Sequence, residues 1–341
     1  VANDKSLAKA ILSEDDEGSK HLTEVGNAKR LVRRHGDNLH YVYPWKRWLV
    51  WDGQRWCKDE SGEVERLAKE TVASIYGEAA EAPTVDKRQA LAVWAMKSEK
   101  ENMIRRGMIE LAKSESGIPV VPSQLDSDPW VLNCANGTLD LRTGTLRPHN
   151  RTDLITKLAP VAYDANAESP RWEAFLDRIL GGNRKLIWFV QRAVGYTLTG
   201  STTEQVFFLL YGTGNNGKTK FVETIQAMLG DYAAQTRMET FMVKYGDQIP
   251  EDVARLAGAR FVAAVEAEEG RRLAESLVKQ LTGGDVVAAR FLYRATFEYK
   301  PEFKIWLAAN HKPTIRGTDH AIWRRVRLVP FTVTIPEEEQ D

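Results

Sequence analysis

The sequence lacks several features that would place the protein in a particular class. It has two cysteines among 341 residues, Cys57 and Cys134, and their wide separation does not suggest a metal-binding or redox motif. No apolar run approaches the roughly 20 residues that cross a membrane, and the first residues contain no apolar signal-peptide core. We therefore expect a cytoplasmic protein that has no membrane partner.

The chain also lacks net charge, because Lys and Arg total 47 and Asp and Glu total 47. Any surface that binds nucleic acid must therefore be a local patch, formed within one chain or by assembly of several. No internal repeat or low-complexity segment stands out, and the length predicts two or three domains. The chain begins without Met and stops soon after a strand-like stretch, so we expect a piece of a longer polypeptide.

Three zones of the chain differ in their residue pattern. Residues 1–165 mix helical stretches with short strands, and residues 166–200 are typical of helix, a connector that we expect to support oligomerisation. From residue 201 to 341, apolar strands alternate with helices, which predicts a parallel sheet covered on both faces. The predicted fold class is therefore α/β in the third zone, preceded by a mixed α+β domain.

Local signals refine the first zone. The segment Trp48–Trp56 predicts two short strands around an Asp-Gly turn. A small core that needs large side chains is the simpler interpretation, and stacking of nucleic-acid bases on the tryptophans is the alternative. Helices over 64–115 are predicted to break near Pro83, and Thr138–Leu141 lies in a predicted hairpin.

The segment Gly212–Thr219 fits the P-loop pattern G-x-x-x-x-G-K-[ST] at every fixed position. It lies between an apolar strand, Val206–Tyr211, and a predicted helix, Gly217–Leu229, which is the context that the motif needs. Its glycines let backbone N–H groups point at phosphate oxygens, and the helix N-terminus adds partial positive charge. The residues that we expect to bind ATP are Gly212, Thr213, Gly214, Asn215, Asn216, Gly217, Lys218, Thr219 and Lys220. Lys218 would reach the β- and γ-phosphates, and the Thr219 hydroxyl would ligate Mg²⁺.

Acidic residues follow the next buried strand, Phe261–Val265. Hydrolysis assisted by Mg²⁺ needs a carboxylate at the end of a neighbouring strand, to hold the metal and polarise water. Glu266 is placed for that role, Glu268 is the second candidate and Glu269 the third. A solvated acidic helix start is the alternative, and it fits Glu269 best.

Two further signals are expected at the same site. Asn310 follows the apolar strand Ile305–Ala309, where a neutral amide would orient the attacking water; an ordinary turn residue is the alternative. Arg324 and Arg325 precede the strand Val326–Phe331, and a guanidinium inserted into a neighbouring subunit's site would stabilise transition-state charge. A basic surface cluster is the alternative for this pair.

Two strand-like runs around a basic turn predict a hairpin between Val286 and Lys300. It carries Arg290, Arg294 and Lys300, which would contact the phosphates of single-stranded DNA if several hairpins faced a central channel. A plain surface hairpin is the alternative.

The order of these motifs resembles that of superfamily 3 helicases, and within them the phage and plasmid primase-helicases related to the poxvirus primase-helicase. The resemblance over about 200–335 rests on Gly212–Thr219, Glu266–Gly270, Lys279–Asp285, Phe297–Pro301, Leu307–Pro313 and Ala321–Arg325. Over about 25–200 it rests on Trp51–Trp56, Asn136–Leu141, Tyr163-Asp164, Pro170–Trp172 and Gly195-Tyr196.

The resemblance implies an AAA+-like motor, a homo-oligomer that is hexameric, with ATP and Mg²⁺ as cofactors. It implies movement on single-stranded DNA, 3′ to 5′, during replication of a phage or other mobile element in a bacterial cell, with 1–165 contributing a collar. Relatives carry a primase domain or work with a primase partner. Here Ala267 separates Glu266 from Glu268, whereas many members of the superfamily have two adjacent acids, so the division of roles between the two stays open.

The same motifs are compatible with two other functions. A nucleotide-switched DNA-binding or loader ATPase would use the same hairpin without processive unwinding. A P-loop kinase is disfavoured, because no acceptor pocket can be recognised and an arginine pair acting in trans would be superfluous. Asp126-Ser-Asp128 has the spacing of a two-metal priming site, but it lies in a turn-like stretch, so we do not expect this chain to make primers.

Overall fold

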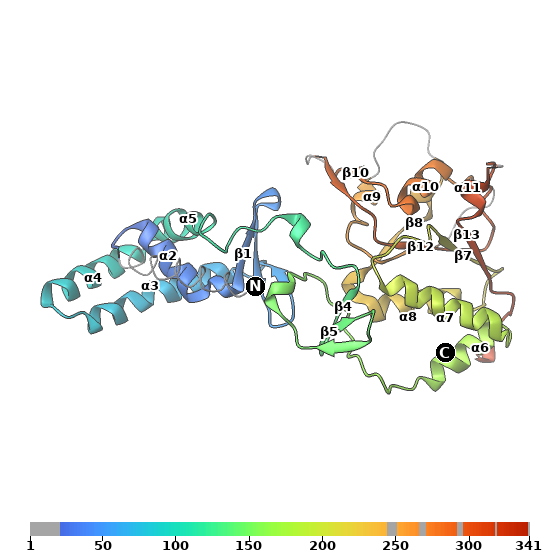
Figure 1. Cartoon of the computed structure of the whole chain (residues 1–341), viewed down its shortest axis with the longest axis horizontal. Coiled ribbons are helices and arrows are strands. Elements are labelled where there is room, and N and C mark those ends of the chain that lie inside the picture. Colours follow the sequence, from blue (N-terminus) through green and yellow to red (C-terminus); the bar gives the residue numbers. More distant parts are fainter. Residues whose placement is uncertain (1–20, 244–250, 266–270, 292–295, 318, 340–341) are drawn as a thin grey trace. The chain divides into compact units, whose positions relative to one another are not determined.

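The computed structural model describes residues 21–243, 251–265, 271–291, 296–317 and 319–339 (Figure 1). The chain forms two compact units, one made of Val1–Ser127 with Asn150–Thr156 and the other of Asp128–His149 with Lys157–Asp341. The zones 1–165, 166–200 and 201–341 that the sequence suggested remain predictions about functional regions. The second unit also includes Asp128–His149, which lies in the first of these zones and forms a small antiparallel sheet.

Helices dominate the first unit. They are α2 (Glu24–His35), α3 (Glu63–Glu81), α4 (Val85–Ser98), the π-helix η3 (Met103–Ile109) and α5 (Glu110–Ala112), with short 3-10 turns η1 (Gly36–Asn38), η2 (Tyr43–Trp45), η4 (Pro122–Gln124) and η5 (Arg151–Asp153). The predicted break near Pro83 is confirmed, because α3 ends before it and α4 begins after it with Thr84 as N-cap. None of the helices in the described parts of the chain is long and apolar enough to cross a membrane.

The tryptophan-rich segment forms part of a small antiparallel sheet in the first unit. Its strands are β1 (Leu39–Val42), β2 (Arg47–Trp51) and β3 (Trp56–Lys58), and they lie in that order. Trp56 is 1% exposed and packs with Leu49 and Val120, while its Nε1–H donates to Arg151 O at 2.9 Å. The interpretation of this segment as a small core is therefore confirmed for Trp56.

The second unit contains a five-stranded parallel sheet and confirms the predicted α/β fold class. The sheet strands are β7 (Phe207–Tyr211), β8 (Ala233–Arg237), β9 (Phe261–Val265), β12 (Lys304–Ala309) and β13 (Val326–Pro330), in the order β13-β7-β12-β9-β8. The helices of this unit are α6 (Pro170–Ile179), α7 (Arg184–Leu198), α8 (Lys218–Leu229), α9 (Glu251–Ala254), α10 (Glu275–Gly283) and α11 (His320–Trp323), with η6 (Gly230–Tyr232), η7 (Met238–Phe241) and η8 (Glu337–Glu339). Antiparallel strands complete it: β4 (Val131–Cys134), β5 (Gly137–Asp140) and β6 (Thr145–Arg147) in one sheet, and β10 (Val287–Ala289) with β11 (Phe297–Tyr299) in another.

Two features of the second unit were absent from the sequence-based expectation. The edge strand β8 is one, because its partly exposed residues lack the apolar run that marks the central strands. The other is the division of the region 171–199 into α6 and α7. Gly181 and Gly182 lie between these helices with φ of +62° and +69°, a conformation in which glycine is favoured.

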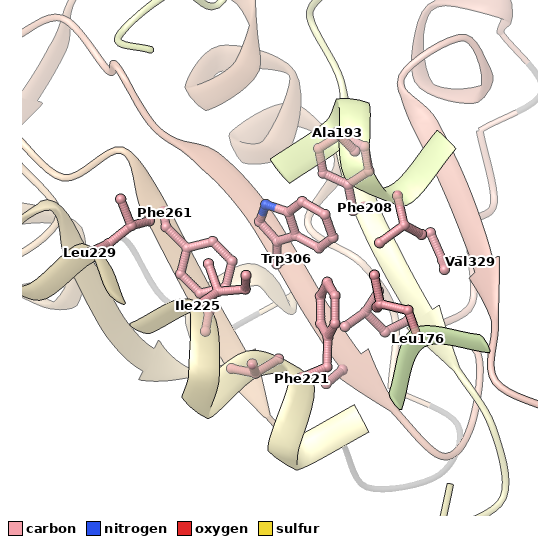
Figure 2. Close-up of a cluster of buried hydrophobic side chains, with 14 of the residues drawn as sticks. Leu176, Ala193, Phe208, Phe221, Ile225, Leu229, Phe261, Trp306 and Val329 are labelled. Atoms are coloured by element: carbon pink, nitrogen blue, oxygen red, sulfur yellow. The ribbon is translucent and has the colours of Figure 1, made fainter. Parts of the chain in front are cut away.

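The core beneath the sheet is centred on Trp306 of β12 (Figure 2). Its ring is fully buried and stacks on Phe208 of β7 with a centroid distance of 4.1 Å. Phe221 of α8 and Phe261 of β9 each lie with ring centroids 5.8 Å from it. The indole Nε1–H donates to Thr197 Oγ1 of α7 at 3.2 Å. One side chain thus joins three strands to the helix that follows the P-loop and to the helix that precedes β7.

The C-terminal end of α7 is fixed by two buried basic side chains. Lys304, 1% exposed, donates to Ser201 O at 3.1 Å and also to Thr199 O, and burial lowers its pKa well below the ordinary value. Arg260 donates to Leu198 O at 2.8 Å. Leu198 O belongs to the last turn of α7, where carbonyl groups lack partners within the helix and carry partial negative charge, so Arg260 satisfies one of them, while Lys304 holds the chain that leaves the helix. The helix α7 is therefore a rigid part of the second unit.

A pair of leucine substitutions in the parallel sheet tests this account of the core. Leu307 of β12 is fully buried, so Leu307→Ala should lower the free energy of unfolding by about 2–5 kcal/mol. Leu328 of β13 is 43% exposed, and Leu328→Ala should stay within about 0.5 kcal/mol of wild type. Urea unfolding measures both, and an equal loss of stability in the two variants would contradict the burial assigned to Leu307.

Candidate functional site

The carboxyl ends of the parallel strands meet at one edge of the sheet. Tyr211, the last residue of β7, is in register with Ala309 of β12 and with Pro330 of β13. The P-loop that follows Tyr211 and the Asn310 that follows Ala309 therefore leave the sheet at the same level. Ligands of open parallel sheets bind at this edge, so the expected site has the position that the fold favours.

The segment from Gly212 to Gly217 connects β7 to α8 in a shape that requires glycine at both ends. A Cβ on Gly212 would lie 2.1 Å from the backbone oxygen of Phe331. At Gly217, φ is +81°, and a Cβ would lie 2.5 Å from Cγ2 of Ile179 in α6. Neighbouring protein atoms thus occupy the positions where side chains would stand, so packing holds both ends of the loop against the rest of the unit.

The ammonium group of Lys218 links the loop to the neighbouring strand. It donates to Gly212 O at 2.5 Å, Asn216 Oδ1 at 3.0 Å and Asn310 Oδ1 at 3.2 Å. The side chain is 7% exposed, and burial lowers its pKa. The structure therefore places Lys218 in direct contact with Asn216 and with Asn310, although Asn310 is distant from both in the sequence.

The first turn of α8 is basic and contains no acidic residue. Lys218 is buried there, whereas Thr219 and Lys220 are exposed, and Lys220 forms an ion pair with Glu223 at 3.6 Å. A helix N-terminus carries partial positive charge, so a lysine buried in the first turn is unfavourable for stability unless an anion is nearby. The arrangement fits a polyphosphate better than it fits a purely structural turn.

The remaining loop residues contact the segment that follows β13. Asn216 Nδ2 donates to Phe331 O at 3.2 Å, and Asn215 O accepts from Ile335 N at 2.7 Å. Asn215 adopts φ of +44°, and Gly214 adopts +113°. Thr213 is exposed. The part played by residues 331–335 in shaping the loop was not expected from the sequence, because no local pattern connects it to the P-loop.

The predicted acidic residues Glu266, Glu268 and Glu269 lie outside the described residues. The strand that leads to them is described: Val265, the last residue of β9, is in register with Ala308 of β12. Among the described residues, no group of three or more His, Cys, Asp or Glu side chains could hold a metal ion. The assignment of Mg²⁺ to Thr219 and Glu266 stays a prediction.

The two arginines expected to act in trans have different environments. Arg325 is 7% exposed, and its guanidinium donates to Thr282 Oγ1 at 3.2 Å and to Ala321 O at 2.6 Å. Burial lowers its pKa. Arg324 is exposed and donates to Gln205 Oε1, which Arg325 also contacts, at 3.3 Å. Arg325 is thus tied within its own chain, and Arg324 is the one that a neighbouring molecule could meet.

The predicted basic hairpin is formed by β10 and β11, with Ala289 in register with Phe297. Arg290 and Lys300 are exposed at its ends, and Arg294 lies outside the described residues. The hairpin is anchored by the Tyr299 hydroxyl, which donates to Val253 O at 2.7 Å and whose pKa is raised by burial.

One further cation near the loop was not expected. Lys312 Nζ lies 4.5 Å from the ring centroid of Tyr211, the residue before Gly212. Lys312 follows Asn310 by two residues, and this position was the signal in the sequence that could have placed it near the P-loop.

The chain matches two protein families. The family described as "D5 N terminal like" matches residues 28–181, and a family of unknown function, DUF5906, matches residues 210–325.

Three viral proteins are similar to parts of the chain. The "Putative helicase L207/L206" of Acanthamoeba polyphaga mimivirus is 25% identical over 304 residues, which are 83% of this chain and 32% of that protein. The "Putative helicase 022R" of Frog virus 3 is 36% identical over 153 residues, 43% of this chain and 16% of that protein. The "Putative primase C962R" of African swine fever virus is 25% identical over 60% of this chain and 22% of that protein. The chain thus spans about a third or less of these relatives.

A solved structure has the same fold. It is the C-terminal region (305–718) of NrS-1, which matches 92% of this chain and 64% of its own chain with a TM-score of 0.55 and 10% sequence identity.

Substitution of two glycines in the second unit tests the geometry of the loop. Gly212→Ala should lower the free energy of unfolding by about 1–3 kcal/mol, because its Cβ would displace backbone at Phe331. Gly195 in α7 has no atom within 4 Å of an added Cβ, so Gly195→Ala should be neutral or stabilising by up to about 1 kcal/mol. Thermal unfolding distinguishes the two, and an unperturbed Gly212→Ala protein would show that the loop is not held against residue 331.

Proposed function

We propose that the chain, which matches the family described as "D5 N terminal like" over residues 28–181 and DUF5906 over residues 210–325, is the ATP-hydrolysing motor of a DNA helicase. The observation that carries this proposal is the contact of Lys218 Nζ with both the P-loop and Asn310. A motor needs a lysine that binds phosphate and a second group that detects its loss, and here the two are in direct contact.

Each residue of the site has a distinct role in this proposal. The backbone N–H groups of Gly212–Gly217 and the Lys218 ammonium group hold the β- and γ-phosphates, with Thr219 as a ligand of Mg²⁺. The ion neutralises phosphate charge when it is bound. Asn310 orients the attacking water, and Glu266, with Glu268 as the second candidate, polarises it.

Asn310 also couples hydrolysis to movement in this proposal. Its side-chain oxygen accepts from Lys218, so a change in the partners of Lys218 alters the environment at the end of β12. The strand β12 is the centre of the sheet and carries Trp306, which contacts α8 and α7. A rigid path thus leads from the phosphate-binding group into the body of the second unit.

The nucleic-acid partner is single-stranded DNA, contacted by Arg290, Arg294 and Lys300 of the hairpin. Assembly into a ring, a hexamer by resemblance, would place these hairpins around one strand, and 3′ to 5′ is the direction that the resemblance implies. A primase domain or partner would supply primers for the same replication machinery. The relatives named as helicases and primases support this setting.

The substitution Lys218→Ala tests the nucleotide site. The loop backbone remains, but the γ-phosphate loses its charged partner, so ATP hydrolysis should fall by about 10²–10³-fold. Arg255→Ala is the control. Arg255 is exposed and forms an ion pair with Glu251, so the variant protein should hydrolyse ATP at the wild-type rate. Thermal unfolding provides a second readout, since Mg-ATP should stabilise the wild-type protein more than Lys218→Ala. Hydrolysis by Lys218→Ala at the wild-type rate would refute the site.

Mixing two inactive variants tests the arginine. Lys218→Ala has no working site but keeps Arg324, and Arg324→Ala keeps its site but lacks the donor. Interfaces between the two variants should restore hydrolysis if Arg324 acts in trans. Arg324 is exposed, so Arg324→Ala should fold normally, whereas Arg325→Ala should be destabilised because it removes the hydrogen bonds from the buried guanidinium to Thr282 Oγ1 and Ala321 O. Mixed assemblies that form and yet never recover turnover would exclude Arg324 as the donor.

A further inference from the structure

A groove lies between α6 and α7, within the segment 166–200 that the sequence predicts to support oligomerisation, and its lining includes no residue of the nucleotide site or of the β10–β11 hairpin. Its volume is about 470 Å³, and it is lined by Glu173 of α6 and by Arg184, Lys185, Ile187, Trp188 and Gln191 of α7. Ile187 is 8% exposed and belongs to the core, whereas the other five residues are exposed. Volumes of this size accommodate ligands as large as a nucleotide.

The exposed tryptophan in this groove is unusual among the described residues. Trp188 is 65% exposed, compared with 52% for Trp323 and 39% for Trp45. The guanidinium of Arg192, one turn along α7, lies 5.3 Å from its ring centroid. A cation near the ring face orients an indole, although Arg192 does not itself line the groove. A large aromatic surface is thus kept in water, where a ligand could stack on it.

The charge of the groove favours an anionic ligand. Arg184 and Lys185 line it and Arg192 adjoins it, whereas Glu173 is the acidic residue of its lining. Cations that surround an exposed aromatic ring are the combination by which proteins bind single-stranded nucleic acid: the cations contact phosphates and the ring stacks on a base. A second copy of the chain would need an acidic surface opposite these cations, so the charges favour the nucleic acid.

The groove is also held in place before any ligand binds. The side chain of Asn183 caps α7 by accepting from Leu186 N at 3.2 Å, and Lys304 and Arg260 fix its other end. The opposite face of the helix, with Val190 and Ala193, is buried in the core. Binding would therefore require little ordering beyond side-chain rotamers, which lowers its entropic cost.

We propose that the α6–α7 groove binds single-stranded nucleic acid, with a base stacked on Trp188 and phosphates held by Arg184 and Lys185. The groove would be a second site of contact with nucleic acid on the second unit, separate from the β10–β11 hairpin. Binding of nucleic acid to the groove does not require ATP hydrolysis. The proposal rests on the proposed function for the choice of single-stranded DNA as its probe.

Fluorescence anisotropy with a labelled thymidine oligonucleotide of about 16 residues tests this contact. Trp188→Ala should weaken binding by about fivefold to a hundredfold, and Trp188→Phe should retain most of the affinity. In the double variant Arg184→Gln, Lys185→Gln, the slope of log affinity against log salt concentration should become less steep. The change should be about 0.7 for each phosphate that the protein no longer neutralises. Trp45→Ala is the matched control, because Trp45 is also exposed and has Lys58 Nζ 6.0 Å from its ring centroid; its affinity should equal that of wild type.

An oligonucleotide of the same length without bases isolates the stacking. Wild type and Trp188→Ala should bind it equally, because only phosphates remain. Without DNA, Trp188→Ala should hydrolyse ATP at the wild-type rate. The weaker binding should also appear in the Lys218→Ala background, so that a failed motor assignment would be distinguished from a failed groove assignment.

Three outcomes would overturn the proposal. Equal affinity of Trp188→Ala and wild type for the normal oligonucleotide would exclude stacking on Trp188. Displacement of the strand by equal concentrations of thymidine monophosphate would identify a pocket for free nucleotides. A change in sedimentation of Trp188→Ala without DNA, at the concentrations of the binding assay, would make the groove an interface between copies of the chain.

Discussion

The ammonium group of Lys218 is the contact on which the proposed activity depends, because it joins parts of the chain that are distant in sequence. Its three partners are oxygens of Gly212, Asn216 and Asn310, from the P-loop and from the end of β12. Burial makes each contact stronger than it would be in water, and it also makes an unpartnered ammonium group costly. The same group can therefore exchange protein oxygens for phosphate oxygens at modest cost.

Rigid packing around the loop makes that contact specific. Trp306 fixes α7 and α8 against the sheet, Ile179 of α6 approaches Gly217, and the segment after β13 approaches Gly212. The last two contacts leave room for glycine and for no larger residue at the loop ends. The shape of the loop and the burial of the lysine are thus consequences of the same packing, which also fixes the orientation of α7 and its exposed tryptophan.

The sequence predicted the parts of this arrangement that depend on local pattern. Apolar runs located β7, β9, β12 and β13, and the P-loop motif located the start of α8. The polar edge strand β8 carries no such pattern. Tertiary contacts decide the rest: Arg324 and Arg325 are adjacent and chemically identical, and only the positions of Thr282 and Ala321 bury one of them. The hydrogen bond from Ile335 N to Asn215 O likewise joins residues far apart in the chain, beyond the reach of local signals.

A crystal structure of the chain with Mg²⁺ and a non-hydrolysable ATP analogue would test the central claim most directly. The account predicts that Lys218 Nζ lies within hydrogen-bonding distance of β- and γ-phosphate oxygens, with the Asn310 amide beside the γ-phosphate. A nucleotide bound elsewhere, or a Lys218 that keeps its contact with Gly212 O and touches no phosphate, would contradict it.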